Sequence, residues 1–406
     1  MISVAEALAL ILEHPWEGGY REVTLKDANG AWLAEHIVAD RAFPPFDRVT
    51  LDGIAINMTT LKALSTWQDG LIIPVEGIHF AGQTPKSLSH PTHAMEVMTG
   101  AVMPYGADTV IRYEDLQFQE IEGKKYVKIK TLPERVGLNV HHKGTDRREG
   151  DLLISEGTKL SPAEIAVAAS VGKSTLKVRQ MPRMAIISTG DELVDISTKP
   201  LLHQIRRSNS YMLQAALTQQ GATVELFHLL DDKALIREKV AELLDTFDAL
   251  ILSGGVSEGK ADFVPTVLAE LGVEKLFHKV AQRPGKPFWF GRSPEGKAVF
   301  ALPGNPVSTF VCCYKYVFGW LQVVQHPNLP TKAVLAQPLL FQPNLAYFVP
   351  VNTHFSEDGQ LLATPLRGSG SGDFANLLEC DGFLELPPEP TEFATGEVYE
   401  FIGFRN

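Results

Sequence analysis

The sequence predicts a multidomain protein of the α/β plus β class, built around a doubly wound α/β domain. Its 406 residues exceed what one hydrophobic core usually accommodates, so about two to four domains are expected. From Arg183 onward, apolar strand patterns alternate with helix patterns, which is typical of a largely parallel sheet covered by helices. On either side of this region, short β-rich segments are broken by glycine and proline, as in small antiparallel domains.

The part of the chain before this alternation is predicted to be mostly β-structure. Ser3-Val4-Ala5-Glu6 forms a capping box that starts a short amphipathic helix ending near His14. Strand patterns follow between Glu22 and Asp40, and the rigid sequence Pro44-Pro45-Phe46-Asp47 marks a domain junction. The β-rich runs between Asp52 and Lys130 predict a small antiparallel barrel or sandwich.

The α/β domain is preceded by a helix that starts at Ser161-Pro162, with serine as the N-cap and proline in the first turn. Its expected strands are Met184–Ser188, Val224–Leu230, Ala249–Leu252 and Val299–Leu302. Its expected helices are Asn209–Gln220 with Ser208 as N-cap, Lys233–Phe247, Asp262–Leu271 and Val307–Leu321. A separate small β domain is predicted after about Pro330, with strands at Ala333–Leu335, Ala346–Val351, Leu361–Ala363, Phe383–Leu386 and Val398–Phe401.

The composition limits the classes of function. The formal net charge of -11 argues against a broad nucleic-acid-binding face, so no nucleic-acid partner is expected. An anionic substrate would have to be held by local donors, a metal ion or a few lysines. The three cysteines, Cys312, Cys313 and Cys380, are interpreted as core thiols in a reducing compartment. Without an apolar stretch of membrane-spanning length or a signal-peptide pattern, we expect a cytoplasmic protein with no membrane partner.

Three glycine-rich turns are the most informative motifs. Ser188–Glu192, Ser253–Gly259 and Leu302–Pro306 each follow an apolar run and precede a predicted helix. Small residues let backbone N–H groups approach an anion, and the next helix adds the positive end of its dipole. One such turn is usually only a tight connection. Three turns at the ends of neighbouring strands are expected to form one anion-binding crevice, which favours a nucleotide- or phosphate-handling enzyme.

Charged residues near these turns complete the predicted site. Glu192 in the first turn and Asp262 after the second are suited to hold a hard cation such as Mg²⁺ against a phosphate. Lys286, fixed in the turn Pro284-Gly285-Lys286-Pro287, is a candidate phosphate or oxyanion contact. The segment Ser369-Gly370-Ser371-Gly372-Asp373 is either a linker tip or a wall rich in hydroxyl and N–H groups.

Other types of site are not indicated. The adjacent His141 and His142 cannot easily face one ion together, so we expect no zinc site. A nucleophile elbow with a Ser/His/Asp arrangement is missing from the sequence, which counts against an acyl hydrolase. Taken alone, Asp52 and the charged run from Asp146 to Arg148 have an ordinary interpretation as turn and loop residues.

Ordered motifs carry a resemblance to a known family. They are Pro44–Asp47 with Leu51–Ala55, Met98–Ala101 with Gly106–Val110, Lys143–Asp146, Ser188–Leu193, Ser253–Gly259 with Ala261–Phe263, Arg283–Pro287 and Ala301–Ser308. These segments resemble signature motifs of the MoeA family of molybdopterin molybdenumtransferases, which is related to the E domain of gephyrin. The likeness runs almost from one end of the chain to the other.

The resemblance implies four parts and a homodimer with a cleft shared between subunits. An elongated N-terminal domain would span 1–45 and 140–178, and an inserted β domain 46–139. The α/β domain would span 179–327, and a C-terminal β-barrel 328–406. The implied reaction takes adenylylated molybdopterin and molybdate, hydrolyses the adenylate in a Mg²⁺-dependent step, inserts molybdenum and releases AMP. The adenylyltransferase of the same pathway is a further candidate partner.

The family's site residues carry over to matching positions. Glu192 and Asp262 would hold Mg²⁺, and Ser253, Gly254, Gly255 and Ser257 would line the phosphate pocket. Lys286, Pro287, Ser308 and Ser371 would form the molybdate pocket, and Gly304 and Asn305 would add substrate contacts. Asp52, Thr99 and Asp146 would reach the cleft from the other domains, as residues of the partner subunit. The implied catalytic set is Asp52, Thr99, Asp146, Glu192, Asp262 and Lys286.

Several positions depart from the family pattern. Arg48-Val49-Thr50 replaces Asn-Ser-Ala, Ile54 replaces a tyrosine, Glu258 adds a negative charge and Arg283 stands in place of a lysine. The family has an arginine early in the C-terminal domain, but the stretch from Asn344 to Pro350 has no basic residue here. If that arginine holds molybdate in the family, this chain would use Arg367 or Lys286 instead, or would bind the anion weakly. Two alternatives to the insertion reaction therefore stay open: a molybdopterin adenylyltransferase, and a non-catalytic paralogue that binds pterin or serves as a scaffold.

Overall fold

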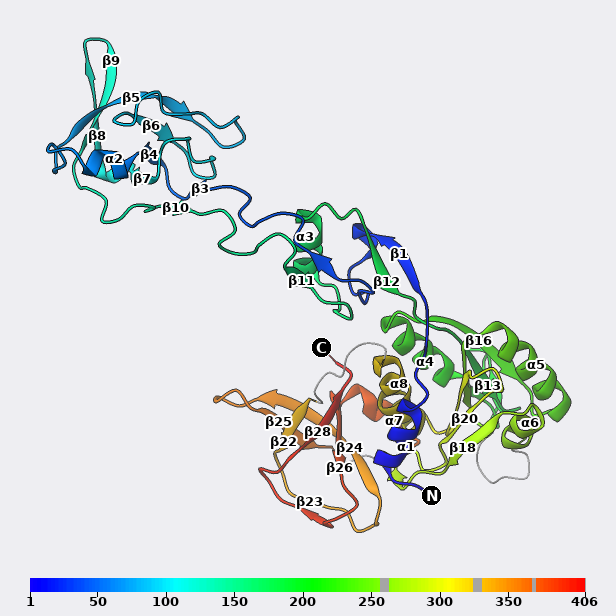
Figure 1. Ribbon diagram of the computed structural model, residues 1–406. Helices are drawn as coiled ribbons and strands as arrows, with labels where there is room; N and C mark the ends of the chain where they lie inside the picture. Colours follow the sequence, from blue (N-terminus) through cyan, green and yellow to red (C-terminus); the bar gives the residue numbers. More distant parts are fainter. Residues whose placement is uncertain (256–262, 324–330, 367–369, 406) are drawn as a thin grey trace.

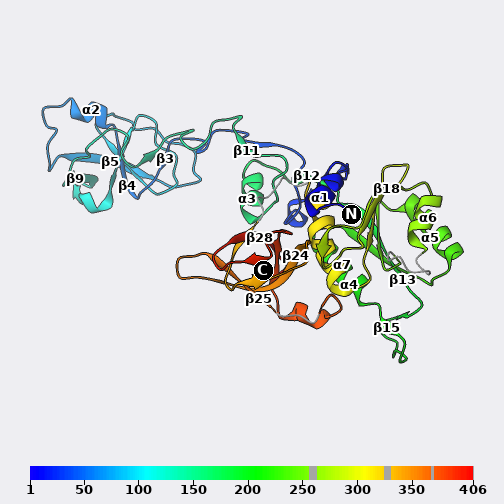
Figure 2. The same ribbon diagram turned by 90° about the horizontal axis from the view of Figure 1, so that it is seen from below.

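The computed structural model describes residues 1–255, 263–323, 331–366 and 370–405. The molecule is elongated (Figures 1 and 2). A β-rich body lies at one end, and a narrow region of paired strands joins it to a larger body that contains both chain termini. None of the helices in the described ranges combines the length and the apolar character needed to cross a bilayer.

The first helix, α1 (Val4–Leu12), starts with the predicted capping box. The Glu6 N–H donates to Ser3 Oγ over 3.1 Å, and the Ser3 N–H donates to Glu6 Oε2 over 2.8 Å. The helix buries Val4, Ala7 and Ile11 in the same core as the α/β sheet. The N-terminus is therefore packed on the α/β body, although the next strand already belongs to the connecting region.

The connecting region consists of outgoing and returning strands that pair with each other. Its antiparallel pairs are β1 (Tyr20–Thr24) with β12 (Thr175–Arg179), β2 (Ile37–Val38) with β11 (Leu152–Ile154), and β3 (Arg48–Val49) with β10 (Val140–His141). Helix α3 (Pro162–Ser170) packs beside them, and its predicted Ser161 cap is confirmed as a capping box with Glu164. This region has a small core of its own around Leu33 and Val178.

The β-rich body contains one six-stranded sheet with the order β7-β4-β6-β5-β9-β8. Its strands are β4 (Gly53–Ile56), β5 (Ile72–His79), β6 (Ala94–Val97), β7 (Thr109–Arg112), β8 (Leu116–Ile121) and β9 (Lys124–Ile129). The prediction of antiparallel pairing is wrong for β5 and β6, which run parallel. The long segment between these strands allows the crossover that a parallel pair requires, whereas a hairpin cannot. Helix α2 (Met58–Lys62) covers part of this body.

The predicted doubly wound α/β domain is confirmed, with the strand order β16-β13-β17-β21-β20-β18. The parallel strands are β16 (Thr223–Leu229), β13 (Arg183–Thr189), β17 (Ala249–Ser253) and β21 (Ala298–Leu302). The sequence analysis missed two strands of this sheet. β20 (Trp289–Arg292) pairs antiparallel with β21, and the edge strand β18 (Glu274–His278) pairs antiparallel with β20.

Helices cover both faces of this sheet. Along β13, Met184 and Ile186 face the core that contains α4 (Ser208–Gln219) and α7 (Pro306–Cys312). Ala185 and Ile187 face the other core, which contains α5 (Lys233–Thr246) and α6 (Val264–Glu270). Because both faces are buried, the strands are continuous apolar runs rather than alternating patterns.

Two helix predictions need correction. The expected helix Val307–Leu321 is divided into α7, a π-helical turn η3 (Cys313–Val317) and α8 (Phe318–Val323). All three segments are rich in buried side chains, so an apolar pattern alone does not reveal the change of winding. Helix α4 begins at Ser208, and its N-cap is Arg207, which makes no side-chain capping bond.

The C-terminal part is a closed five-stranded barrel. The barrel strands are β22 (Lys332–Leu335), β24 (Ala346–Phe355), β25 (Leu361–Pro365), β26 (Gly382–Leu386) and β28 (Val398–Gly403). They follow the order β24-β25-β22-β28-β26, and pairing of β26 with β24 closes the ring. A short strand of the α/β body, β19 (Gln282–Arg283), joins β24 in parallel.

A buried ion cluster holds the barrel against the α/β body. Lys315, in the π-helical turn, is 8% exposed. Its ammonium lies 2.6 Å from Glu385 Oε2 on β26 and 2.7 Å from Glu400 Oε1 on β28. Burial raises the pKa of Glu385, and the Lys315 charge opposes this effect.

We expect Lys315→Met to lower the free energy of unfolding by about 3–5 kcal/mol, because it leaves a buried carboxylate without its cation. A carboxyl group with a raised pKa favours the folded state below its unfolded pKa and loses that contribution as the pH rises through its folded pKa. The loss should therefore be larger at about pH 8 than at about pH 5. Denaturant unfolding at both pH values measures it.

The matched control is Lys233→Met, which removes an exposed 2.6 Å ion pair with Glu270. It should change the stability by at most about 1 kcal/mol. Equal losses in the two variants would contradict the role assigned to the buried cluster.

Candidate functional site

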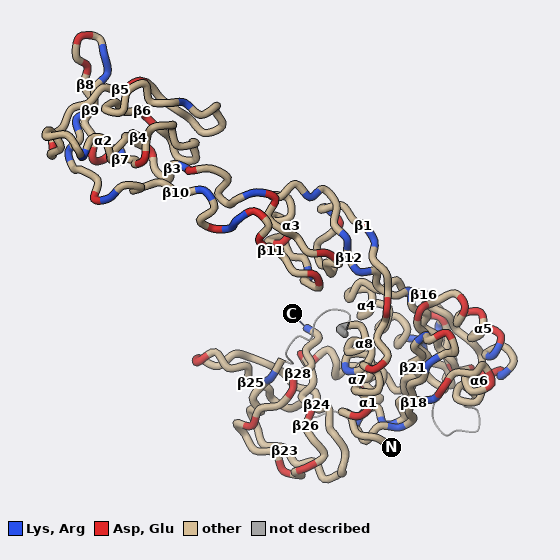
Figure 3. Tube along the Cα trace, in the orientation of Figure 1, with Lys and Arg blue, Asp and Glu red and all other residues tan. Residues whose placement is uncertain are grey.

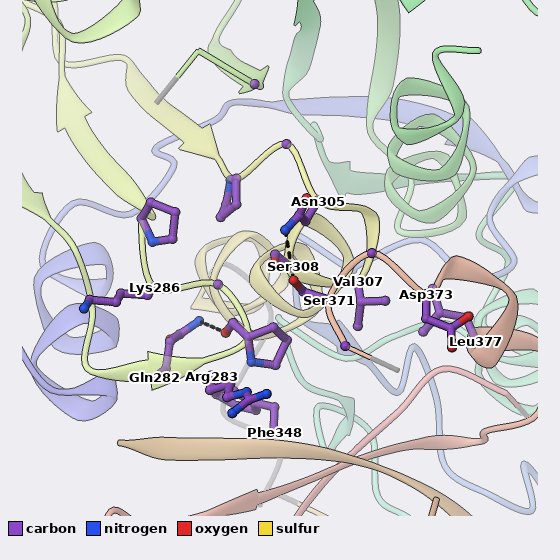
Figure 4. A pocket seen from close by; sticks show the side chains of 18 of the residues that line it. Gln282, Arg283, Lys286, Asn305, Val307, Ser308, Phe348, Ser371, Asp373 and Leu377 are labelled. Atoms are coloured by element: carbon purple, nitrogen blue, oxygen red, sulfur yellow. Dashed lines mark hydrogen bonds between the residues drawn. The ribbon is translucent and has the colours of Figure 1, made fainter. Parts of the chain in front are cut away.

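A cavity of about 1150 Å³ lies between the α/β body and the C-terminal barrel. The glycine-rich turns form one side, and β24 with the segment Gly370–Leu377 forms the other (Figure 4). The predicted site residues that line this cavity are Glu192, Gly254, Gly255, Lys286, Pro287, Gly304, Asn305, Ser308 and Ser371. Ser253 ends β17 directly before the second turn and is 4% exposed.

The second turn requires glycine at two successive positions. Gly254 and Gly255 have φ angles of 99° and 68°, which side-chain-bearing residues rarely adopt. A Cβ atom on Gly254 would lie 2.9 Å from the Thr189 carbonyl oxygen, and one on Gly255 would lie 2.8 Å from Val264 Cγ2. The backbone of the second turn thus packs directly against the first turn and against α6.

The third turn joins the α/β body to the C-terminal part. Asn305 Nδ2 donates to Ser371 Oγ over 2.9 Å, and the Val307 N–H donates to the Ser371 carbonyl oxygen over 3.1 Å. Figure 4 shows the Asn305–Ser371 contact beside Ser308. The sequence allowed two interpretations of the segment that contains Ser371, a linker tip or a wall of the site. In the structure, Ser371 lines the cavity.

The turn Pro284–Pro287 is supported from beneath by buried groups. Gln282 is 1% exposed, and its Nε2 donates to the Pro284 carbonyl oxygen over 3.0 Å. The Tyr316 hydroxyl donates to Gln282 Oε1. A Cβ on Gly285 would lie 2.5 Å from Gln282 Nε2 and 2.7 Å from Cys312 Sγ, so the turn accepts only glycine there. Lys286 is therefore held on a fixed backbone while its side chain is exposed.

Arg283 and Lys286 are the two cations among the described residues that line the cavity. Arg283 lies opposite Tyr347 in the parallel pairing of β19 with β24. Burial raises the pKa of the Tyr347 hydroxyl, and the nearby Arg283 charge opposes it. In Figure 4 the Lys286 side chain extends away from the Asn305–Ser371 contact. The stretch Asn344–Pro350, which has no basic residue, thus lies beside the Arg283 guanidinium of the neighbouring strand.

Acidic residues from two neighbouring strands face the same cavity. A Cβ on Gly190 would lie 2.5 Å from Glu192 Oε2, so the carboxylate occupies the space that the glycine leaves open. Asp231, which the sequence analysis missed, also lines the cavity. Its N–H donates to Asp191 Oδ1 over 3.0 Å. Asp231 could have been found from its position in the sequence, because it follows the end of β16 and so lies at the same sheet edge as the first turn.

These two carboxylates are suitable ligands for a hard divalent cation such as Mg²⁺. Among the residues that the structure describes, no group of three or more His, Cys, Asp or Glu side chains is arranged to hold a metal ion. The predicted ligand Asp262 and the predicted pocket residue Ser257 lie outside the described residues, as do Glu258 and Arg367. The magnesium assignment therefore stays a prediction.

An apolar wall faces the polar turns across the cavity. It contains Leu345, Tyr347, Phe348 and Pro350 from the start of the barrel and Leu377 from the segment η4 (Phe374–Leu378). A combination of apolar and aromatic side chains with placed polar groups is typical of small-molecule binding sites. The sequence analysis did not identify this wall.

The other predicted catalytic residues lie outside the cavity of their own chain. Asp52 precedes β4 and Thr99 follows β6, both in the distant β-rich body (Figure 1). Asp52 Oδ1 accepts bonds of 2.7 Å from the N–H and the hydroxyl of Thr99, and these bonds lower the pKa of the carboxyl group. Two residues that the family resemblance named separately are thus hydrogen-bonded to each other, although they are 47 residues apart in the chain.

Asp146 lies where the returning chain approaches the connecting region. Its Oδ1 is 3.0 Å from His141 Nε2, and the other ring nitrogen of His141 is 3.1 Å from Arg48 Nη2. A guanidinium group can only donate, so His141 Nδ1 accepts and Nε2 carries the proton shared with Asp146. Figure 3 shows acidic and basic residues interspersed along this part of the chain. Arg48, a departure from the family pattern, is thereby connected to a predicted site residue.

Comparisons with known proteins agree along the whole chain. Residues 2–172 match the MoeA N-terminal region (domain I and II), residues 185–323 a probable molybdopterin binding domain, and residues 332–404 the MoeA C-terminal region (domain IV). The molybdopterin molybdenumtransferase of Synechocystis sp. is 40% identical, with all of both chains covered. That of Bacillus subtilis is 31% identical over 100% of this chain and 94% of the relative.

The fold agrees with the sequence comparison. A solved structure of a molybdopterin biosynthesis MoeA protein from Pyrococcus horikoshii superposes with a TM-score of 0.83 at 30% identity, covering 100% of each chain. The family models, the relatives and the fold agree. The chain therefore belongs to the MoeA family of molybdopterin molybdenumtransferases.

Proposed function

We propose that this protein inserts molybdate into adenylylated molybdopterin, with hydrolysis of the adenylate and release of AMP. The observation that carries the proposal is the single cavity in which glycine turns, two cations and two strand-end carboxylates face an apolar wall. The names of the relatives support the same reaction. The glycine turns fit the phosphate of the nucleotide, and the wall around Phe348 fits a ring system.

The chain's own residues would act by binding and orientation. Backbone N–H groups of the second and third turns would stabilise negative charge that builds up during cleavage of the adenylate. Arg283 and Lys286 would attract the molybdate dianion, and Ser371 would orient it from the barrel side. Glu192 and Asp231 fit Mg²⁺, with Asp262 as the further ligand expected from the family. When bound, Mg²⁺ would neutralise charge on the phosphate.

A homodimer is part of the proposal. Asp52, Thr99 and Asp146 do not line the cavity of their own chain. A second subunit would bring them to the cleft. Val38 and Leu152, which are register partners on β2 and β11, are 48% and 52% exposed. An apolar pair of this kind on a narrow region suits burial against another subunit.

The test of the proposed reaction is molybdate-dependent release of AMP from adenylylated molybdopterin by the purified protein. AMP release that requires both molybdate and Mg²⁺ would support insertion. Formation of adenylylated molybdopterin from ATP and molybdopterin would instead support the adenylyltransferase. Binding of the pterin without either reaction would support the non-catalytic alternative.

Glu192→Gln should abolish Mg²⁺-dependent release of AMP, because it removes a ligand charge but preserves the size of the side chain. We expect a decrease of at least about 10²-fold in rate, since metal stabilisation of a phosphoryl group contributes several kcal/mol. The control is Glu238→Gln, an exposed residue of α5. Normal turnover of Glu192→Gln at limiting Mg²⁺ would contradict the metal assignment.

Lys286→Ala should weaken the use of molybdate more than the binding of the adenylate. Loss of one charge-assisted contact costs about 1.5–3 kcal/mol, or roughly a 10- to 150-fold higher KM for molybdate. Ser371→Ala should act in the same direction but less strongly. Lys275→Ala, on the edge strand β18, is the control. If Lys286→Ala leaves the molybdate dependence unchanged while Arg283→Ala raises the KM, the anion is held by the guanidinium instead.

Light scattering at micromolar concentration should give twice the mass of the 44.6 kDa chain. Val38→Asp combined with Leu152→Asp should shift the protein towards the monomer, because the two charges would be buried at the subunit contact. A mass of one chain for the unaltered protein would refute the dimer and, with it, the shared cleft.

A further inference from the structure

One side-chain amide connects the second and third glycine turns. Asn209 is the second residue of α4, and its Nδ2 lies 2.8 Å from the Gly304 carbonyl oxygen. The same nitrogen lies 3.1 Å from Ser253 Oγ and 3.2 Å from Thr309 Oγ1. Of the three acceptors, Gly304 lies in the turn after β21, Ser253 at the end of β17 and Thr309 in helix α7. Four elements of the α/β body thus meet at one carboxamide.

The turns that Asn209 connects are in direct contact. A Cβ atom on Gly304 would lie 3.7 Å from Gly254 Cα, which is van der Waals distance. The Gly254 N–H donates to the Leu302 carbonyl oxygen over 3.3 Å. The β17–β21 ladder ends at Ser253 and Leu302. Beyond it, one long backbone bond and the Asn209 amide hold the described parts of the two turns together.

The Thr309 hydroxyl already donates a hydrogen bond within this junction. The Thr309 hydroxyl donates to the Pro303 carbonyl oxygen, so its oxygen is directed to accept from Asn209. Thr309 is 0% exposed and Ser253 4% exposed, so water does not easily substitute for a lost amide. In such a buried network each hydrogen bond strongly affects the positions of its neighbours.

We infer that Asn209 is a positioning residue, which sets the spacing of the two glycine turns and so the placement of their N–H groups around the anionic part of the substrate. It does not line the cavity and has no expected contact with the substrate. The inference rests on the proposed function for its catalytic consequence. The structural part, the control of turn spacing, stands on the contacts alone.

The experiment compares Asn209→Ala with Gln214→Ala. Gln214 is a matched control because it lies on the same helix and its carboxamide contacts only the Val224 carbonyl oxygen, over 3.5 Å, within the described residues. Hydrogen exchange is measured on peptides that cover residues 250–255 and 302–306, and on α5 as a reference. Turnover is measured as AMP release from adenylylated molybdopterin.

In Asn209→Ala, we expect faster exchange in both turn peptides and unchanged exchange in α5. The kcat should fall by about tenfold or more, because small displacements of oriented groups reduce rates strongly, while the KM changes far less. Gln214→Ala should behave as the unaltered protein. Thr309→Val should show the same pattern more weakly, and the double variant should lose less than the sum of the two effects.

Three outcomes would overturn the inference. They are unchanged turn exchange with unchanged turnover, a loss of turnover with unchanged turn exchange, and faster exchange throughout the protein. If Asn209→Ala cannot be isolated, Asn209→Ser is measured in its place. Should the unaltered protein release no AMP while Asn209→Ala still loosens the two turns selectively, the proposed reaction fails but the control of turn spacing holds.

Discussion

The cavity exists only as long as the C-terminal barrel stays on the α/β body, and the buried ammonium of Lys315 is central to that contact. It bridges Glu385 and Glu400 from two barrel strands, and the ammonium and the Glu385 carboxylate lie where water has little access, whereas Glu400 is partly exposed. Such a cluster is sensitive to the loss of any member. The pairing of β19 with β24 adds backbone bonds beside it. Together they keep Ser371 and the apolar wall opposite the glycine turns.

Much of the fold could be predicted because its central strands are buried on both faces. The strands β13 and β17 are continuous apolar runs, and helices of ordinary length separate the parallel strands. The antiparallel edge was missed because Glu274–His278 mixes charged and apolar residues without a clear pattern. The π-helical turn was missed because its residues continue the apolar pattern of the flanking helices.

The site could be predicted where local chemistry reveals it. The glycine turns follow strands, and strand ends of a parallel sheet meet at one edge, so residues such as Gly254 and Asn305 were correctly expected to converge. Gln282 and Asn209 were not found, because their roles arise from contacts with residues far away in the chain. The bond from Asn209 to Gly304 spans 95 residues. Neither amide differs in sequence from an ordinary polar residue.

The narrow connecting region has a consequence for how the β-rich body could have been acquired. Arg48 and His141 are register partners, so the two points at which the chain enters and leaves this body lie side by side. A segment with adjacent ends can be inserted into an existing fold, or excised from it, with little rearrangement of the host. The β-rich body can also fold separately, because every strand of its sheet lies between these two points of the chain. The β-rich body is therefore a unit that evolution could add or exchange as a whole, since the described residues that line the cavity of its own chain all lie outside it.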